Sequence, residues 1–176
     1  MSREAAALDV ISTRVSVRHF TGDKLTGEQI ETILRAGISA PTAVNKQPWA
    51  FVVVDDEAVL KELSVALPSS RIENGASHAI VVCGDMQKAL DGEAQGYWVE
   101  DTSAATENML LAAHAMGLGG LWVGVYPISE RVKTVSTIIG APEHIVPMCL
   151  VVLGHPDEQP AVKDKYKEEN IHHNKW

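Results

Sequence analysis

Four short apolar runs, separated by segments of helical pattern, constrain the fold of this chain more than any other feature. They occupy residues 50–55, 77–85, 117–125 and 147–154, and the third begins with a glycine-rich turn. Short runs rich in Val, Ile and Leu are typical of buried strands. Helices that alternate with such strands predict a layered α/β or α+β fold with at least four buried strands.

The segments between the runs carry recognisable helix signals. Residues 3–12 are weakly helical, and residues 25–37 place Thr26 as an N-cap with Gln29 three positions later. Residues 57–68 form an apolar helical pattern that ends at Pro68.

Two further helices are predicted in the second half of the chain. Residues 98–116 are small or apolar on nearly every side in their later half, so we expect a central helix that is covered all round. Residues 129–140 predict an amphipathic helix capped by Ser129 and closed by Gly140.

Composition limits the classes of protein that this chain can be. A length of 176 residues with 45% hydrophobic residues predicts one domain over residues 1–176, with a polar tail over about 156–176. The net charge of −8 argues against non-specific nucleic-acid binding, which needs a basic face. No apolar run approaches the roughly 20 residues that span a bilayer, and the amino terminus is acidic, so we expect a soluble cytoplasmic protein.

The cysteines and histidines do not indicate a metal site. Cys83 and Cys149 lie within apolar runs, where buried thiols in a reducing cytoplasm are the expected state. The histidines lack the spacing and the supporting cysteines of a typical zinc site.

Three motifs bear on chemistry. In RVSVRHF, residues 14–20, alternation puts Arg14, Ser16 and Arg18 on one side, which suits either an anion site or a solvated edge.

The second motif, GLGGLWVG, is not a dinucleotide fingerprint, because a helix precedes it and Trp122 occupies the last glycine position. Its glycines serve either a tight helix-to-strand turn or a close approach of backbone to a flat ligand. The third motif, SAPTAVNKQPWAF at residues 39–51, gathers hydroxyl and amide groups before a strand.

Together these motifs resemble, in order and over almost the whole chain, those of the nitroreductase family of FMN-dependent NAD(P)H oxidoreductases. The closing segment KYKEENIHHNKW is also similar to that of the family. The resemblance implies an α+β fold of three layers, with a mixed, mainly antiparallel sheet flanked by helices, in an intertwined homodimer. It also implies FMN bound at the subunit interface.

The resemblance assigns expected roles to individual residues. Those expected to hold FMN from one subunit are Arg14, Val15, Ser16, Arg18 and Lys165, the last standing where many members carry an arginine. Those expected to reach the flavin of the partner subunit are Pro41, Thr42, Ala43 and Asn45, with Thr42 replacing the commoner serine. The backbone expected beside the isoalloxazine includes Leu121, Trp122, Gly124 and Val125. Gln47, Pro48 and Trp49 either hold this loop on the core or, for Trp49, contact the ring.

The implied activity is two-electron, ping-pong reduction of nitroaromatics, quinones or similar flat acceptors by NAD(P)H, with no catalytic side-chain acid or base. Three alternatives share the same motifs: reductive dehalogenation or enone reduction, oxidative flavin breakdown, and non-catalytic FMN binding. The sequence leaves the acceptor and the choice between NADH and NADPH open.

Overall fold

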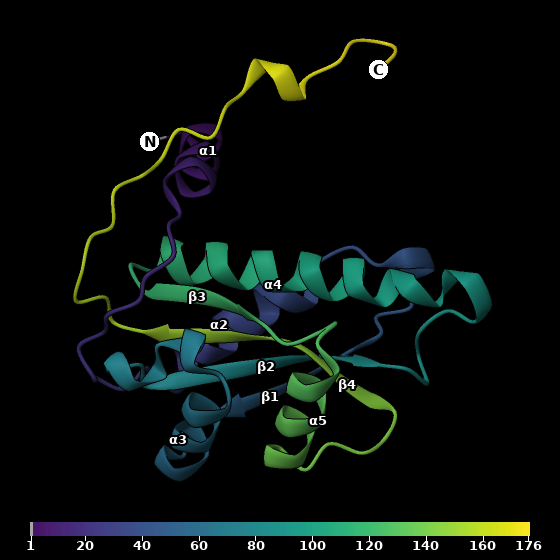
Figure 1. The fold of residues 1–176 in the computed structure, drawn as a ribbon. Helices are drawn as coiled ribbons and strands as arrows, with labels where there is room; N and C mark the ends of the chain where they lie inside the picture. Colours follow the sequence, from purple (N-terminus) through teal and green to yellow (C-terminus); the bar gives the residue numbers. More distant parts are fainter. Residues whose placement is uncertain (1) are drawn as a thin grey trace.

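A computed structural model describes residues 2–176 and contains a four-stranded sheet at its centre (Figure 1). The strands are β1 (Trp49–Val54), β2 (His78–Asp85), β3 (Gly119–Gly124) and β4 (Ile145–Gly154), in the spatial order β1-β2-β4-β3. All three pairings are antiparallel. The α+β class and the predominance of antiparallel pairing are therefore confirmed, and within residues 2–176 the sheet contains no parallel pair.

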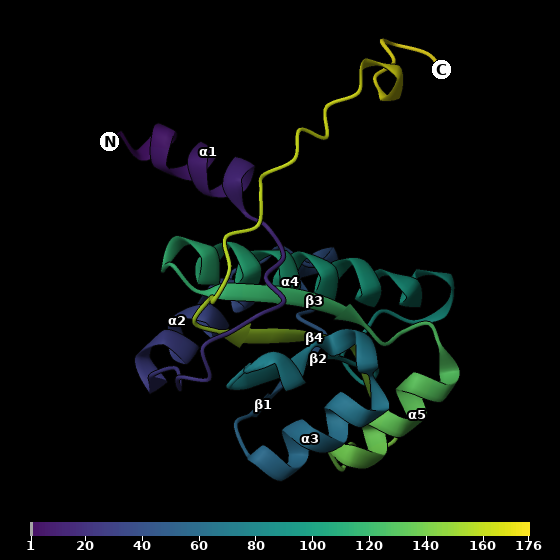
Figure 2. The same ribbon diagram turned by 60° about the vertical axis from the view of Figure 1, so that its left-hand side comes forward.

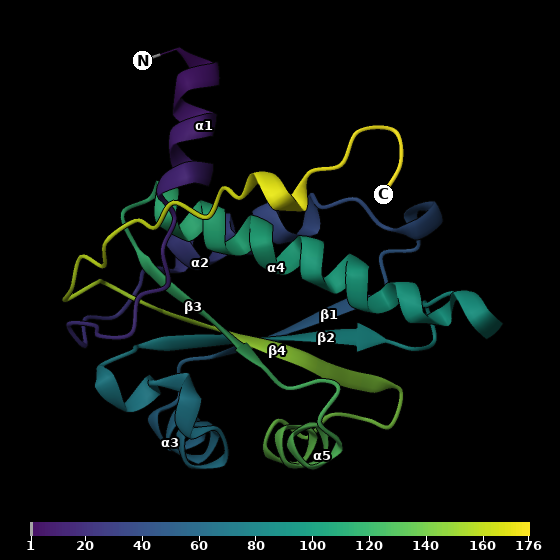
Figure 3. The ribbon, with the colours of Figure 1, turned by 45° about the horizontal axis from the view of Figure 1, so that its top comes forward.

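Helices cover both faces of this sheet and give the molecule three layers. The five α-helices are α1 (Arg3–Thr13), α2 (Gly27–Ile38), α3 (Glu57–Ala66), α4 (Tyr97–Ala115) and α5 (Ser129–Ile138). Figure 3 shows α3 and α5 on one face and α2 and α4 on the other. Short 3-10 turns occur at Ala43–Asn45, Pro68–Ser70, Ile72–Asn74, Gly92–Gly96 and Glu168–Asn170.

The strand β2 contributes buried side chains to the apolar clusters on both faces of the sheet. All eight of its residues are buried, since it lies between β1 and β4 with helices on either side. Val81 belongs to the cluster that includes residues of α3 and α5, whereas Ile80 and Val82 belong to the cluster of α2 and α4. Because successive side chains of a strand point to opposite faces, a continuous apolar run is needed at this position. The edge strand β1 is less buried than predicted, with only Trp49 and Val54 fully covered.

Most of the predicted helix signals are confirmed. Thr26 and Gln29 form a reciprocal capping box at the start of α2, and Gly140 follows α5 with a φ of +63°. The prediction for Ser129 is wrong: Ile128 occupies the N-cap position, and no side-chain hydrogen bond caps α5. Ser129 is instead the first residue of the helix, one position too late to cap it, and the carbonyl of Ile128 accepts from the Val132 N–H at 3.0 Å.

The expectation that α4 is covered all round is wrong for the single chain. One face of the helix is buried, but Leu111 and Ala112 are only partly covered and Ala115 is exposed. The helix α1, which contains no buried residue, projects beyond this side of α4 (Figure 2). The tail runs out on the same side, and every residue from 161 to 176 is exposed. The side of α4 that lies next to α1 and the tail is therefore partly open to solvent in the single chain.

The two cysteines and the apolar character of the helices also bear on the expectations from sequence. Cys83 and Cys149 are buried free thiols, as predicted. No helix within residues 2–176 has the length and apolar character needed to cross a membrane.

Candidate functional site

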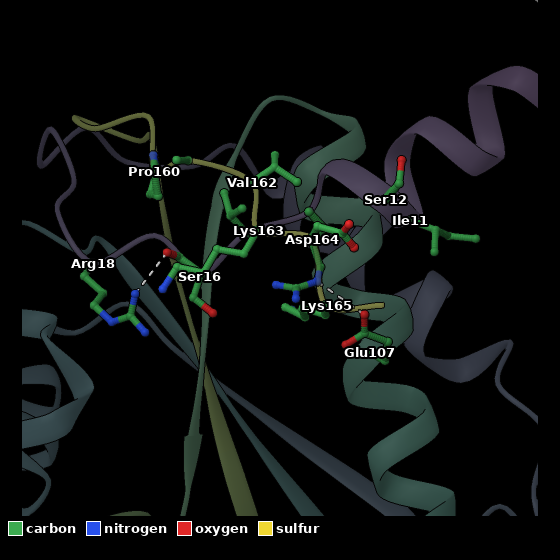
Figure 4. A pocket seen from close by; sticks show the side chains of 13 residues that line it. Ile11, Ser12, Ser16, Arg18, Glu107, Pro160, Val162, Lys163, Asp164 and Lys165 are labelled. Carbon is green, nitrogen blue, oxygen red and sulfur yellow. Dashed lines mark hydrogen bonds and ion pairs between the residues drawn. The ribbon is translucent and has the colours of Figure 1, made fainter. Parts of the chain in front are cut away.

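A cavity of about 780 Å³ lies between the end of α1, the extended segment 14–18, α4 and the tail (Figure 4). This volume falls in the range of roughly 300–1,000 Å³ that is usual for cofactor and ligand sites. Five residues predicted from the sequence line it: Arg14, Val15, Ser16, Arg18 and Lys165. The fold thus brings the amino-terminal motif and the tail together, although about 150 residues separate them in the chain.

Buried side chains fix the segment 14–18 on the sheet. Val17 and Phe20 are 6% and 5% exposed, and the Val17 N–H donates to the carbonyl of Gly120 at 3.1 Å. A Cβ atom on Gly119 would lie 2.8 Å from Val17 Cγ1, so this contact requires glycine. With Val17 turned into the core, alternation leaves the polar residues of the segment beside the cavity.

Positive charge predominates among the cavity-lining residues, although the whole chain carries −8. The lining includes two carboxylates, Glu107 and Asp164, and four cations, Arg14, Arg18, Lys163 and Lys165. Arg14 Nε lies 3.3 Å from Glu107 Oε1, and an Arg18 terminal nitrogen donates to the Ser16 carbonyl at 3.3 Å. An anion with several acceptor oxygens is the ligand that this set of donors suits best.

The loop 41–48 has its own bonding pattern and does not line the cavity in the single chain. Thr42 Oγ1 accepts from the Gln47 N–H at 3.1 Å, and Gln47 Nε2 donates to Asn45 Oδ1 at 3.1 Å. The Ala43 N–H donates to Asp101 Oδ1 at 2.8 Å. Of the residues predicted here, Pro41 and Asn45 are exposed, while Thr42 and Ala43 are partly buried.

Trp49, which follows this loop, is 7% exposed and packs with Ala40 and Ala105. The carbonyl of Pro48 accepts from the Asp85 N–H at 2.9 Å. These contacts favour the interpretation in which Pro48 and Trp49 hold the loop on the core.

The four predicted residues of β3 and its end also lie outside the cavity. Leu121 and Val125 point into the core, Trp122 is partly covered and Gly124 is exposed. A Cβ atom added to Gly124 would have no heavy atom within 4 Å, and the Gly124 carbonyl accepts from Arg131 at 3.0 Å. The other glycines of the motif have structural roles, because Gly117 has a φ of +73° and both Gly119 and Gly120 adjoin buried side chains. Gly117 and Gly124 both have open space where a Cβ atom would lie, but of the two only Gly117 has a left-handed φ, so the glycine at position 124 is explained by neither conformation nor packing.

Sequence reasoning missed three polar residues around these elements. They are Glu107, which pairs with Arg14; Asp101, which binds the loop; and Arg131, which binds Gly124. Carboxylates within a mostly apolar helix could have drawn attention to the first two, but their partners are distant in sequence. Among the described residues 2–176, no group of three or more His, Cys, Asp or Glu side chains is arranged to hold a metal ion.

The sequence pattern of the Nitroreductase family matches residues 11–80 and 66–155 of this chain. The chain belongs to the nitroreductase family. Its relatives within the family include a protein of Archaeoglobus fulgidus provisionally named NADH dehydrogenase/NAD(P)H nitroreductase. That relative is 42% identical over 172 residues, which cover 96% of this chain and 98% of the relative.

Solved structures of other family members share this fold. A protein of Bacteroides thetaiotaomicron, with the same provisional name, is 42% identical and gives a TM-score of 0.91, covering 97% of this chain and 98% of its own. A provisionally assigned nitroreductase of Desulfovibrio desulfuricans, solved in complex with FMN, is 28% identical with a TM-score of 0.82. That alignment covers 97% of each chain. The predicted nitroreductase-like fold is therefore confirmed.

Proposed function

We propose that this protein is an NAD(P)H-dependent oxidoreductase that binds FMN and reduces nitroaromatics, quinones or similar flat acceptors by a two-electron ping-pong reaction. The observation that carries the proposal is the cavity in which Arg14, Ser16, Arg18 and Lys165 converge. The FMN complex of the Desulfovibrio desulfuricans relative and the NAD(P)H in the name of the Archaeoglobus fulgidus relative support it.

The chain's residues fit the two chemically different ends of FMN. Arg14, Ser16 and Lys165 supply charge and hydroxyl donors for a phosphate. Lys165 is a point charge without the planar fork of an arginine, so Arg14 carries the bidentate contact in this assignment. Arg18 is assigned to the pyrimidine edge of the ring, and the open backbone at Gly124 to the ring itself.

We further propose a homodimer in which each site is completed by the partner subunit. The residues assigned to the partner's flavin are Pro41, Thr42, Ala43 and Asn45, which do not reach the cavity of their own chain. An open groove between α1, α2 and α4 offers a surface for the second subunit, with Val10, Ile11 and Leu111 among its lining residues. The exposed tail would extend from this surface onto the partner.

Bound FMN would supply two-electron hydride chemistry between a nicotinamide and a second substrate. The residues of this chain bind and orient it. Arg18 would place a positive charge at the pyrimidine edge of the ring, and Gly124 leaves space for a flat molecule beside β3. No side-chain acid or base is assigned, so protons come from solvent in this proposal.

The test is anaerobic addition of NADH or NADPH to the FMN-loaded protein. An oxidoreductase loses the visible absorption of its flavin, whereas a non-catalytic binding protein keeps it.

Steady-state rates over a grid of NAD(P)H and acceptor concentrations should then give parallel reciprocal lines. Intersecting lines would exclude the ping-pong order, and a screen of quinones, nitroaromatics, enones and halogenated aromatics would separate the proposed activity from the dehalogenase and enone reductase alternatives.

A further inference from the structure

Asp101 is a buried carboxylate on α4 whose partner lies in the loop 41–48. Its side chain is 6% exposed, and Oδ1 accepts from the Ala43 N–H at 2.8 Å across 58 residues of sequence. A buried carboxylate is unfavourable unless it is hydrogen-bonded, and the bond from the Ala43 N–H meets that need here. The bond connects the central helix to the backbone between Thr42 and Val44.

The loop needs such a support because its backbone conformation is unfavourable. Val44, Asn45 and Gln47 all have positive φ values, of 48°, 56° and 51°. For a β-branched residue such as Val44 this conformation is a marked outlier. The Val44 side chain is 80% exposed, so its own packing cannot compensate. The conformation must be imposed by the bonds at the ends of the loop and within it.

The bonds of the loop divide into internal and external ones. Thr42, Asn45 and Gln47 bond to one another, which shapes the loop but does not place it on the body. At its carboxyl end, Pro48 bonds to Asp85 and Trp49 is buried. On the other side of the positive-φ residues, Asp101 binds Ala43. A charge-assisted bond at this point holds the first half of the loop relative to α4.

We infer that Asp101 is a positioning residue for cofactor binding: it holds Thr42, Ala43 and Asn45 in the conformation in which they contact the flavin of the partner subunit. This inference rests on the proposed function. It predicts that loss of the carboxylate weakens FMN binding by a protein that remains folded, although Asp101 is not assigned any contact with FMN.

The test measures the FMN dissociation constants of the wild-type protein and of Asp101→Ala by the change in flavin absorption and fluorescence. We expect the dissociation constant to rise about tenfold in Asp101→Ala, on the scale of one charge-assisted hydrogen bond. Asp101→Asn keeps an acceptor oxygen and should restore most of the affinity. Hydrogen exchange of the Ala43 amide provides a second readout, slow in the wild type and faster in Asp101→Ala.

Asp56→Ala is the matched control. Asp56 Oδ1 accepts from the N–H groups of Ala58 and Val59 at 2.9 and 3.0 Å at the start of α3, on the opposite face of the sheet from α4. Its loss should lower the thermal midpoint without changing the FMN dissociation constant. If Asp101→Ala also lowers only the thermal midpoint, Asp101 has a merely structural role and the inference is wrong.

A variant of the donor keeps the inference testable if Asp101→Ala does not fold. Ala43→Pro removes the N–H while leaving the carboxylate, and Thr42 already has the extended conformation, φ −138° and ψ 156°, that a residue before proline requires. Because Ala43 is itself assigned to the flavin contact, Ala43→Gly, which keeps the N–H, is the matched control for the loss of its side chain. Ala43→Pro should raise the FMN dissociation constant more than Ala43→Gly does. Equal FMN affinities in these two variants would overturn the inference. A wild-type protein that binds no FMN would instead overturn the proposed function.

Discussion

Arg14 Nε lies 3.3 Å from Glu107 Oε1, so an ion pair joins the extended amino-terminal segment to α4 at the wall of the cavity. The Arg14 side chain is 17% exposed, which limits the directions that its guanidinium can take. A guanidinium contacted at Nε can present its two terminal nitrogens to a second anion. The pair therefore orients Arg14 for the phosphate assigned to this cavity.

Arg14→Ala is expected to weaken FMN binding by about tenfold or more, because one charge-assisted bond to phosphate is worth about 1.5–3 kcal/mol. Equilibrium titration of the apoprotein with FMN measures the effect. Arg35→Ala is the control, since Arg35 also forms an ion pair, with Glu31, but lies exposed on α2. If Arg14→Ala binds FMN as tightly as Arg35→Ala does, Arg14 is not part of the site.

The sequence predicted those parts of the fold that depend on local pattern. The capping box of Thr26 and Gln29 and the alternation in residues 14–18 both follow from neighbours a few positions away. Where contacts between distant segments decide the outcome, the sequence left alternatives open. A Cβ atom would crowd Val17 at Gly119 and Leu110 at Gly120, so the run of glycines has a packing cause that spacing alone does not reveal.

The candidate site was predictable only in part for the same reason. The motif at residues 14–18 and Lys165 meet in one cavity, and their assignment to FMN stays a prediction. The left-handed backbone at Val44 is contrary to the preference of a β-branched residue, and only contacts made elsewhere allow it. The bond between Asp101 and Ala43 is one such contact, and no local pattern in the sequence indicates it.

Leu111→Arg is expected to weaken the proposed homodimer and FMN binding together. Leu111 lines the groove between α1, α2 and α4, where a buried, unpaired charge would be costly in a subunit interface. Sedimentation velocity at several protein concentrations measures the association. Val65→Arg is the control, because Val65 is 74% exposed on α3, across the sheet from this groove. A wild-type protein that stays monomeric while binding FMN would contradict the shared site.

The stability of the fold should decrease as the pH falls below about 6.5, the usual pKa of histidine. Burial lowers the pKa of His78; Lys24 lowers it further, while Asp55 partly opposes the shift. Because the folded-state pKa is the lower one, the unfolded chain binds more protons below pH 6.5, and protonation favours unfolding. Above that pH the group contributes no pH dependence.

Urea unfolding at pH 7.5, 6.5 and 5.5 measures this effect through the free energy of unfolding. His78→Gln should show a smaller loss between pH 6.5 and 5.5 than the wild type. His173→Gln, in the exposed tail, should behave as the wild type does. An unchanged pH profile in His78→Gln would assign the loss of stability to other groups.

Gly124→Ala and Gly120→Ala should separate the glycine that serves the ligand from one that serves packing, although both lie on β3. At Gly120 a Cβ atom would lie 2.9 Å from Leu110 Cδ2, so that variant should lose about 1 kcal/mol of stability through overpacking. At Gly124 a Cβ atom meets nothing within 4 Å, so the thermal midpoint should not fall. The new methyl group would instead displace a flat ligand from the backbone, and misplacement on the scale of 1 Å can lower kcat/KM by about a hundredfold. Gly124→Val should show a larger loss of activity than Gly124→Ala at similar stability. Wild-type FMN affinity and NAD(P)H oxidation rates in Gly124→Val would mean that no ligand approaches β3 at this residue.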